Sequence, residues 1–127
     1  KQIHLLLRKY HNMKSPITTH VLDTMRGRPA EGITIVLESR SESEAWKEMS
    51  RSITNADGRI ENLLPPNFKI SPGVYRLTFL TAEYFRTLKV ESFYPFVTVT
   101  FEIRDTAPHY HVPLLLSPHG YSTYRGS

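Results

Sequence analysis

Two histidines stand one residue apart near the end of this 127-residue chain, within the stretch HYHVPLLLS from His109 to Ser117. Imidazole titrates near neutral pH, so a histidine is the natural general base for activating a water molecule. Side chains alternate between the two faces of a strand, so His109 and His111 share one face with Pro113, Leu115 and Ser117. We expect another sheet or another subunit to cover this mixed face.

The opposite face of the same stretch is the predicted core face, formed by Tyr110, Val112, Leu114 and Leu116. A second candidate base, His20, lies mid-strand in the β-branched run ITTHVLDT and shares a face with Thr18 and Leu22. Each histidine also has a purely structural interpretation, as a hydrogen-bonded side chain within a sheet. The residues alone leave open which histidine would be the base.

The spacing of His109 and His111 is also that of a two-histidine metal site. The chain has no cysteine, so a third zinc ligand would have to be another residue such as His20. A metal is therefore possible, but our prediction is a site without one.

Arg59 follows the turn Asn55–Gly58, whose Asp-Gly pair favours a tight turn. The guanidinium group is a rigid fork of donors, so Arg59 could clamp an anion or a developing oxyanion. Its plainer interpretation is a solvated hairpin side chain, and the sequence pattern alone favours that interpretation.

The elements that must position these residues are mostly strands. Alternation and turn residues predict an antiparallel β-sandwich of the immunoglobulin-like or prealbumin-like kind, with one short helix over Thr81–Val90 and Thr81 as its N-cap. The predicted strands are Ile17–Thr24, Ile33–Ser39, Trp46–Thr54, Gly73–Leu80, Val97–Ile103 and the C-terminal stretch from His109 onward.

The net charge of +4 is concentrated at the N-terminus. Residues 1–14 carry four of the sixteen basic side chains and no acid, and the remaining twelve balance the twelve acidic residues. We therefore divide the chain into a basic N-terminal extension, residues 1–14, and one domain, residues 15–127. A balanced domain argues against nucleic-acid binding, which needs a basic stripe on the folded body.

The extension is either a solvated leader or a targeting segment. Its first positions partly resemble the N-terminal peroxisomal nonapeptide signal, although Arg8 and Lys9 stand where that signal has other residues. We expect a peroxisomal or cytoplasmic protein. No apolar run approaches the ~20 residues of a membrane span, so we expect no membrane partner.

Several motifs together resemble one enzyme family. The C-terminal YRGS and the upstream HVPLLLS are the most specific, and they are supported by segments throughout residues 15–127: ITTHVLDT, GRPAEG, TNADGR, GVYRLTF and ESFYPFV. In these motifs the chain resembles the 5-hydroxyisourate hydrolases, transthyretin-related enzymes of purine catabolism that act in urate degradation.

The resemblance implies a prealbumin/transthyretin-like sandwich of two antiparallel sheets, a homotetramer built as a dimer of dimers, and active sites in a channel at the subunit interface. It implies hydrolysis of 5-hydroxyisourate at the C6 carbonyl without cofactor or metal. The implied catalytic residues are His20, Arg59, His111 and Ser127. The implied substrate-binding residues are His20, Arg59 and Tyr124.

Two competing functions remain. A non-catalytic carrier of the thyroid-hormone type would use the same channel but needs an apolar lining, whereas a structural or adhesive module leaves the histidines unexplained. The tail also poses a geometric problem, because Tyr124 and Ser127 point to opposite faces if the tail is fully extended. A kink at Gly126, a backbone contact, or a contribution from a neighbouring subunit would resolve it.

Overall fold

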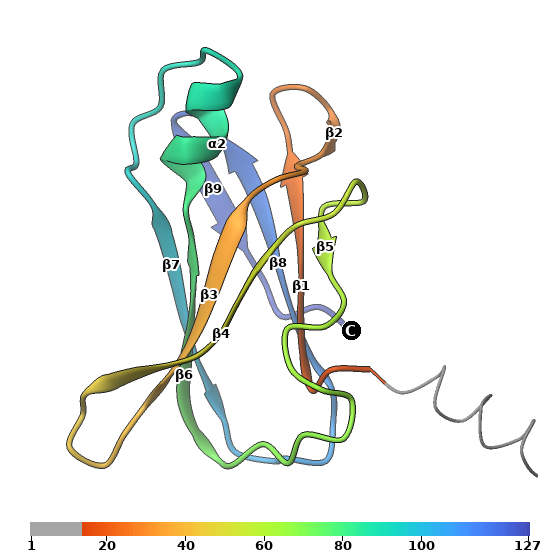
Figure 1. Ribbon diagram of the computed structural model, residues 1–127, viewed down its shortest axis with the longest axis vertical. Coiled ribbons are helices and arrows are strands. Elements are labelled where there is room, and N and C mark those ends of the chain that lie inside the picture. The colour runs from red at the N-terminus through yellow and green to blue at the C-terminus, as the bar shows by residue number, and fades with distance from the viewer. Residues whose placement is uncertain (1–13) are drawn as a thin grey trace, which may run out of the picture.

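Two β-sheets face each other across a common core in the computed structural model, which describes residues 14–127 (Figure 1). The predicted extension, apart from Lys14, lies outside the described residues, and the proposed domain boundary stays a prediction. The first sheet has the order β2-β1-β8-β9, with β5 also paired to β1. Its strands are β1 (Ile17–Asp23), β2 (Arg28–Pro29), β5 (Arg59–Ile60), β8 (Tyr110–Ser117) and β9 (Gly120–Thr123).

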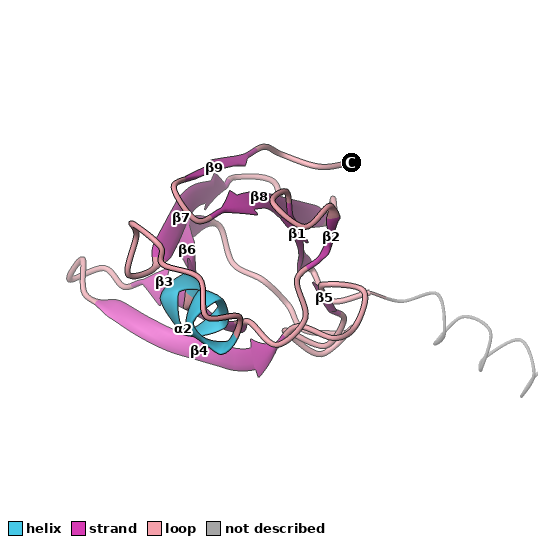
Figure 2. Ribbon diagram, turned by 90° about the horizontal axis from the view of Figure 1, so that it is seen from above, coloured by secondary structure: helices cyan, strands magenta, loops and turns pink. Residues whose placement is uncertain are grey.

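The second sheet has the order β4-β3-β6-β7 and is antiparallel throughout. Its strands are β3 (Thr34–Arg40), β4 (Trp46–Ile53), β6 (Gly73–Phe79) and β7 (Val97–Ile103). Seen from above, the helix α2 (Thr81–Thr87) lies across one end of the space between the sheets (Figure 2). The predicted sandwich is therefore confirmed.

The core is built by alternation that is strict along β1 and is interrupted in β8, where Pro113 is buried as well. In β8 the predicted core face is buried, with Leu114 and Leu116 almost inaccessible to solvent. In β1 the buried positions are Ile17, Thr19, Val21 and Asp23. Both strands therefore direct their remaining side chains away from the core, onto what we call the outer face of the first sheet.

The central pair of the first sheet, β1 and β8, is parallel, which the prediction of purely antiparallel sheets did not include. Its register pairs Thr18 with His111 and His20 with Pro113. Paired residues lie on the same face of a sheet, so Thr18, His20 and His111 all belong to the outer face. The parallel pairing thus brings the two candidate bases onto one surface.

The helix differs from its prediction at both ends. Leu80, not Thr81, is the N-cap, because β6 runs straight into the helix and the Leu80 N–H donates to Thr34 O of β3. The Thr81 hydroxyl is buried without a hydrogen-bond partner. The helix ends at Thr87 rather than Val90, because Lys89 adopts a φ of 56° and the Val90 N–H closes back onto Phe85 O.

The helix is anchored to the end of β1 by a buried hydrogen bond. The Tyr84 hydroxyl donates to Asp23 Oδ2 at 2.6 Å, and Asp23 is fully buried. Burial, and then the Asp23 carboxylate, raise the pKa of Tyr84 far above its ordinary value. Residues 14–127 contain no helix long and apolar enough to cross a membrane.

The last strand separates from β8 at a proline. β9 pairs with β8 up to Leu114↔Thr123, after which Tyr124 faces Pro113, which has no N–H to donate. Thr123 Oγ1 donates to the free Pro113 carbonyl. The chain rejoins β8 only at Gly126, whose N–H donates to His111 O at 2.8 Å. Backbone pairing between the tail and β8 is therefore absent at Tyr124 and Arg125 and resumes at Gly126, beside His111.

Candidate active site

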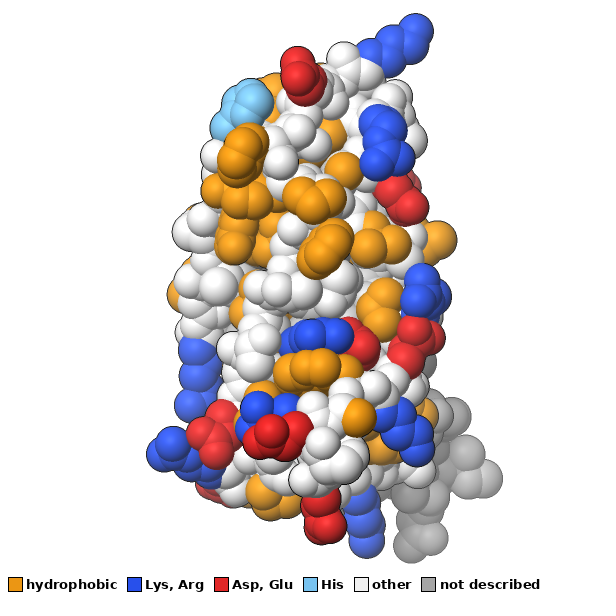
Figure 3. All heavy atoms as spheres, turned by 90° about the vertical axis from the view of Figure 1, so that its left-hand side faces the viewer, with side chains coloured by type: hydrophobic (Ala, Val, Ile, Leu, Met, Phe, Trp, Pro, Cys, Tyr) orange, Lys and Arg blue, Asp and Glu red, His pale blue; other side chains and the backbone are white. Residues whose placement is uncertain are grey.

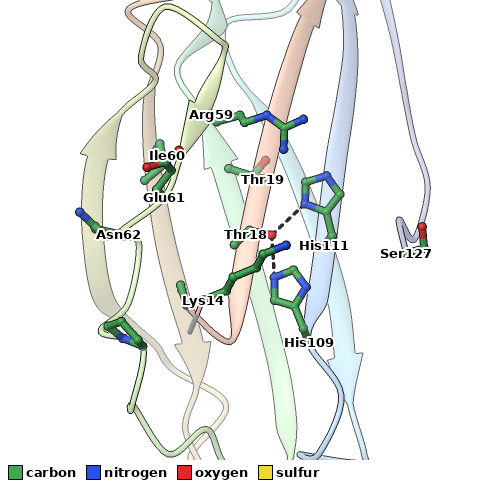
Figure 4. Close-up of a pocket in the computed structure, with 12 residues that line it drawn as sticks. Lys14, Thr18, Thr19, Arg59, Ile60, Glu61, Asn62, His109, His111 and Ser127 are labelled. Atoms are coloured by element: carbon green, nitrogen blue, oxygen red, sulfur yellow. Dashed lines mark hydrogen bonds between the residues drawn. The ribbon is translucent and has the colours of Figure 1, made fainter. Parts of the chain in front are cut away.

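A cavity of about 620 Å³ lies on the outer face of the first sheet, at the edge formed by β1, β5 and the end of the tail. It contains three of the predicted site residues, Arg59, His111 and Ser127 (Figure 4). The other residues along its wall are mainly polar: Lys14, Ser15, Thr18, Thr19, Ile60, Glu61, Asn62, Pro66 and His109.

The two histidines of β8 are joined through a single hydroxyl. Thr18 Oγ1 lies 2.8 Å from His109 Nε2 and 2.8 Å from His111 Nδ1. The imidazole rings are nearly parallel, with centroids 6.3 Å apart. This leaves Nε2 as the free nitrogen of His111, and it points towards Arg59 (Figure 4).

Arg59 is positioned by the turn that precedes it. Asn55 Oδ1 accepts hydrogen bonds from the backbone N–H groups of Asp57 and Arg59, at 2.9 and 3.0 Å. Gly58 has a φ of +72°, and a Cβ atom at this position would lie 2.4 Å from Val21 O. Only glycine lets the turn approach β1 so closely, and the close approach places Arg59 opposite His20.

His20 belongs to the same face but does not border the described cavity. Its cross-strand partner is Arg59, and its charge also acts on His111. Arg59, His111 and Ser127 therefore meet at one cavity, as predicted. His20 lies outside its wall, two residues after Thr18 on β1.

The pKa of each of the three histidines of this face is lowered, which favours the neutral imidazole. Burial lowers the pKa of His111 most strongly, followed by Arg59 and then by His109, His20 and Lys14. Burial and Arg59 likewise lower the pKa of His20, with Asp57 acting in the opposite direction. Burial and Lys14 lower the pKa of His109. A neutral imidazole can accept a proton, so the electrostatics favour a general base.

The tail holds His111 from the side opposite Thr18. A Cβ atom at position 126 would lie 2.6 Å from His111 Cδ2, so the backbone of Gly126 packs directly against the ring. Ser127 then borders the cavity, whereas the Tyr124 side chain is 59% exposed and lies outside it. Within one chain, Tyr124 is not brought together with the other predicted residues.

Within residues 14–127 there is no group of three or more His, Asp or Glu side chains that could hold a metal ion. The nitrogens of His109 and His111 that face each other are both bound to the Thr18 hydroxyl instead.

Sequence reasoning missed Thr18, Lys14 and Asn62 as parts of the site. Only Thr18 had a usable signal, because it lies two residues before His20 and shares its face. Its place between two histidines depends on the register of β1 against β8, which local patterns do not specify.

The arrangement combines a neutral base, a fixed cation and a polar cavity. Such a site can deprotonate a water molecule with an imidazole and stabilise the negative charge that develops when the water attacks a carbonyl. The described wall is polar enough to bind a small ring with several hydrogen-bonding groups.

Comparison with known proteins identifies the family. The HIUase/Transthyretin family matches residues 17–126. The 5-hydroxyisourate hydrolase of Mus musculus is 51% identical over 115 residues, covering 89% of this chain and 96% of the mouse protein. Among solved structures, Klebsiella pneumoniae 5-hydroxyisourate hydrolase has a TM-score of 0.76 and 36% identity, covering 87% of this chain and 98% of that one.

A hormone carrier has the same fold. Sea bream transthyretin in complex with thyroxine has a TM-score of 0.83 but only 28% identity, covering 88% of this chain and 95% of that chain. The TM-score is higher for the hormone carrier, whereas the sequence identity is higher for the hydrolase. We give the identity more weight for function, because one fold can serve several functions while the site residues decide between them. On fold, sequence and coverage alike, the chain belongs to the HIUase/Transthyretin family.

Proposed function

We propose that this protein is an enzyme that hydrolyses 5-hydroxyisourate to 2-oxo-4-hydroxy-4-carboxy-5-ureidoimidazoline in purine catabolism. The observation that carries the proposal is the meeting of a neutral His111 with Arg59 over a polar cavity. The mouse relative at 51% identity bears the name 5-hydroxyisourate hydrolase, which agrees with that chemistry.

In the proposed mechanism, His111 Nε2 takes a proton from a water molecule that attacks the C6 carbonyl of the substrate. General-base catalysis of this kind contributes about 10²–10⁴-fold. Arg59 donates to the oxyanion of the tetrahedral intermediate, and one such donor contributes roughly 3–4 kcal/mol. Collapse of the intermediate breaks the bond between the carbonyl carbon and the ring nitrogen, and the leaving nitrogen receives a proton from His111.

His20, Ser127 and Tyr124 complete the proposed site. His20 lies beside Arg59 and binds the substrate or relays a proton. Ser127 orients the ring or the water from the cavity wall. Tyr124, exposed on this chain, binds substrate in the site of a neighbouring subunit.

The second candidate is a small-ligand carrier of the thyroid-hormone type, favoured by the closer structural match to transthyretin bound to thyroxine. The composition of the cavity argues against it. Lys14, Arg59 and two histidines with lowered pKa border the space, and a carrier for an apolar hormone would line it with apolar side chains.

A homotetramer, assembled as a dimer of dimers, completes the proposal. β7 and β9 end their sheets on the same side of the molecule, where unpaired backbone groups can pair with another copy (Figure 2). Apolar side chains gather on that side, and Phe93, Phe96 and Tyr121 are exposed (Figure 3). A second contact across the outer face of the first sheet would enclose the cavity. We propose a peroxisomal or cytoplasmic location.

The deciding experiment follows the ultraviolet absorbance of freshly generated 5-hydroxyisourate with and without the protein. We expect decay well above the slow spontaneous rate at micromolar protein concentration. Thyroxine binding, measured by calorimetry on the same preparation, tests the carrier. Tight hormone binding without faster decay of 5-hydroxyisourate would refute the enzyme and support the carrier. Light scattering of the same sample reports the oligomeric state.

A further inference from the structure

The Thr18 hydroxyl has two nitrogen partners but only one proton. It lies 2.8 Å from both His109 Nε2 and His111 Nδ1. A hydroxyl that bonds two imidazole nitrogens must donate to one and accept from the other. The tautomers of the two histidines are therefore coupled, since one of the facing nitrogens carries a hydrogen whenever the other does not.

The surroundings of His111 favour one of the two arrangements. Its Nε2 faces Arg59, which carries only donors and a positive charge (Figure 4). A bare, electron-rich Nε2 is stabilised there, so the hydrogen of neutral His111 resides on Nδ1. The Nδ1–H then donates to Thr18 Oγ1, and the Thr18 hydroxyl donates to His109 Nε2.

We propose that Thr18 and His109 act as a proton relay behind His111, which holds His111 Nε2 bare towards the cavity and draws the transferred proton out of the site. This inference rests on the proposed hydrolase function. In this relay the reacting atom remains His111 Nε2, and Thr18 and His109 act through it as positioning residues from the cavity wall.

The relay balances without any further reactant. As Nε2 takes a proton from water, Nδ1–H passes its proton to Thr18 Oγ1, and the Thr18 hydroxyl proton passes to His109 Nε2. His111 is again neutral with its hydrogen on Nε2, Thr18 is again a hydroxyl that now donates to Nδ1, and His109 carries the positive charge. Every hydrogen bond of the chain of three is kept.

The charged neighbours make the transfer reversible. Lys14 faces His109 and His111 from the segment before β1, and Arg59 of β5 and His20 of β1 act on His111. Because Lys14 disfavours a lasting imidazolium at His109, the proton returns along the same path when the leaving ring nitrogen needs one.

Three variants at two positions test separately whether Thr18 orients His111 and whether His109 takes up a proton. Thr18→Val keeps the shape but removes the hydroxyl, whereas Thr18→Ser keeps the hydroxyl. His109→Gln can still accept the Thr18 hydrogen bond through its amide oxygen but cannot take up a proton. Thr78→Val is the matched control, because Thr78 is a half-buried outer-face threonine of a central strand in the other sheet.

We expect Thr18→Val to lower kcat by roughly 10- to 100-fold, by analogy with groups that orient metal-bound histidines, with KM nearly unchanged. Thr18→Ser should restore most of the rate, and Thr78→Val should not change it. His109→Gln should lower kcat about tenfold. Proton–nitrogen NMR of the ring nitrogens should find His111 protonated at Nδ1 in the native protein and in His109→Gln, and in mixed tautomers in Thr18→Val.

A native His111 protonated at Nε2, or a Thr18→Val variant with native kcat, would overturn the relay. The NMR measurement needs no substrate. A native protein that fails to accelerate 5-hydroxyisourate decay would therefore refute the proposed function, while the spectra would still decide whether the hydrogen-bonded chain exists.

Discussion

Each sheet carries an arginine on its outer face, and the two arginines are held in opposite ways. Arg76 of β6 donates to Glu38 at 2.8 Å, and its guanidinium carbon lies 4.2 Å from the centre of the Trp46 ring. Arg59 takes part in none of the ion pairs found within residues 14–127, and its neighbours are His20 and His111. The charge of Arg76 is compensated by a carboxylate, whereas the charge of Arg59 adds to burial in lowering the pKa of two histidines.

The difference teaches how this sandwich separates stability from chemistry. A compensated cation contributes to the packing of its sheet and perturbs little else. A cation placed beside imidazoles without an ion-pair partner lowers their pKa values and remains ready to meet an anion. The same residue type therefore has a structural role on one sheet and a functional role on the other.

The largest expected effect comes from the base itself. His111→Ala should lower kcat by about 10²–10⁴-fold while the protein stays folded, because the water loses its proton acceptor. His119→Ala, at an exposed turn position, is the matched control and should retain native kinetics. Steady-state kinetics checks both, and a change confined to KM would make His111 a binding residue.

The two arginines can be compared directly. Arg59→Met should lower kcat by about 10²–10³-fold and move the acidic limb of the pH–rate profile upwards, because the pKa values of His20 and His111 are no longer lowered by the guanidinium. Arg76→Met should keep native kinetics and lose roughly 1 kcal/mol or less of unfolding free energy, measured in urea. Loss of turnover in Arg76→Met would contradict the division of roles.

A substitution at Gly126 tests whether the packing of the tail positions the His111 ring. Gly126→Ala would place a Cβ 2.6 Å from His111 Cδ2, so the ring must shift. We expect kcat to fall by roughly 10- to 100-fold with little change in Tm, since misplacement of a reacting group costs rate. Gly120→Ala is the control, because its Cβ would meet Ser117 Oγ at an ordinary 3.7 Å. Equal kinetics in the two variants would show that the tail does not position the ring.

The smallest expected effect is on the pH dependence of the unfolding free energy. His20, His109 and His111 have lowered pKa values in the folded protein and return to about 6.5 when it unfolds. The unfolded chain then binds more protons, so the stability present above about pH 6.5 is lost as the pH falls through the lowered values. Urea unfolding at pH 8 and pH 5 should reveal this loss, and the double variant H20Q/H111Q should reduce it.

Local patterns in the sequence predicted the sandwich, the buried face of β8 and the turn before Arg59. Each depends on neighbours within a few residues, such as the alternation of Leu114 and Leu116 with His111. The resemblance to a family supplied the site residues. Their roles stay predictions, and Arg59, His111 and Ser127 meet at one cavity.

The remainder could not be predicted from local patterns, because it depends on contacts between distant segments. Thr18 lies between two histidines only through the parallel register of β1 and β8. The helix ends early because Lys89 takes a left-handed conformation without being glycine. Tyr124 is exposed and lies outside the cavity, although the register of the tail on β8 continues to His111↔Gly126.

The pairing of β1 with β8 also has a kinetic consequence. Thr19 Oγ1 donates to Val112 O across 93 positions of the chain, so the two halves of the candidate site come from opposite ends of the polypeptide. Closing so long a loop is slow, because its entropy is lost before the contacts form. During refolding, catalytic activity should therefore return only with the final closure of the first sheet, after the hairpins of the second sheet have formed.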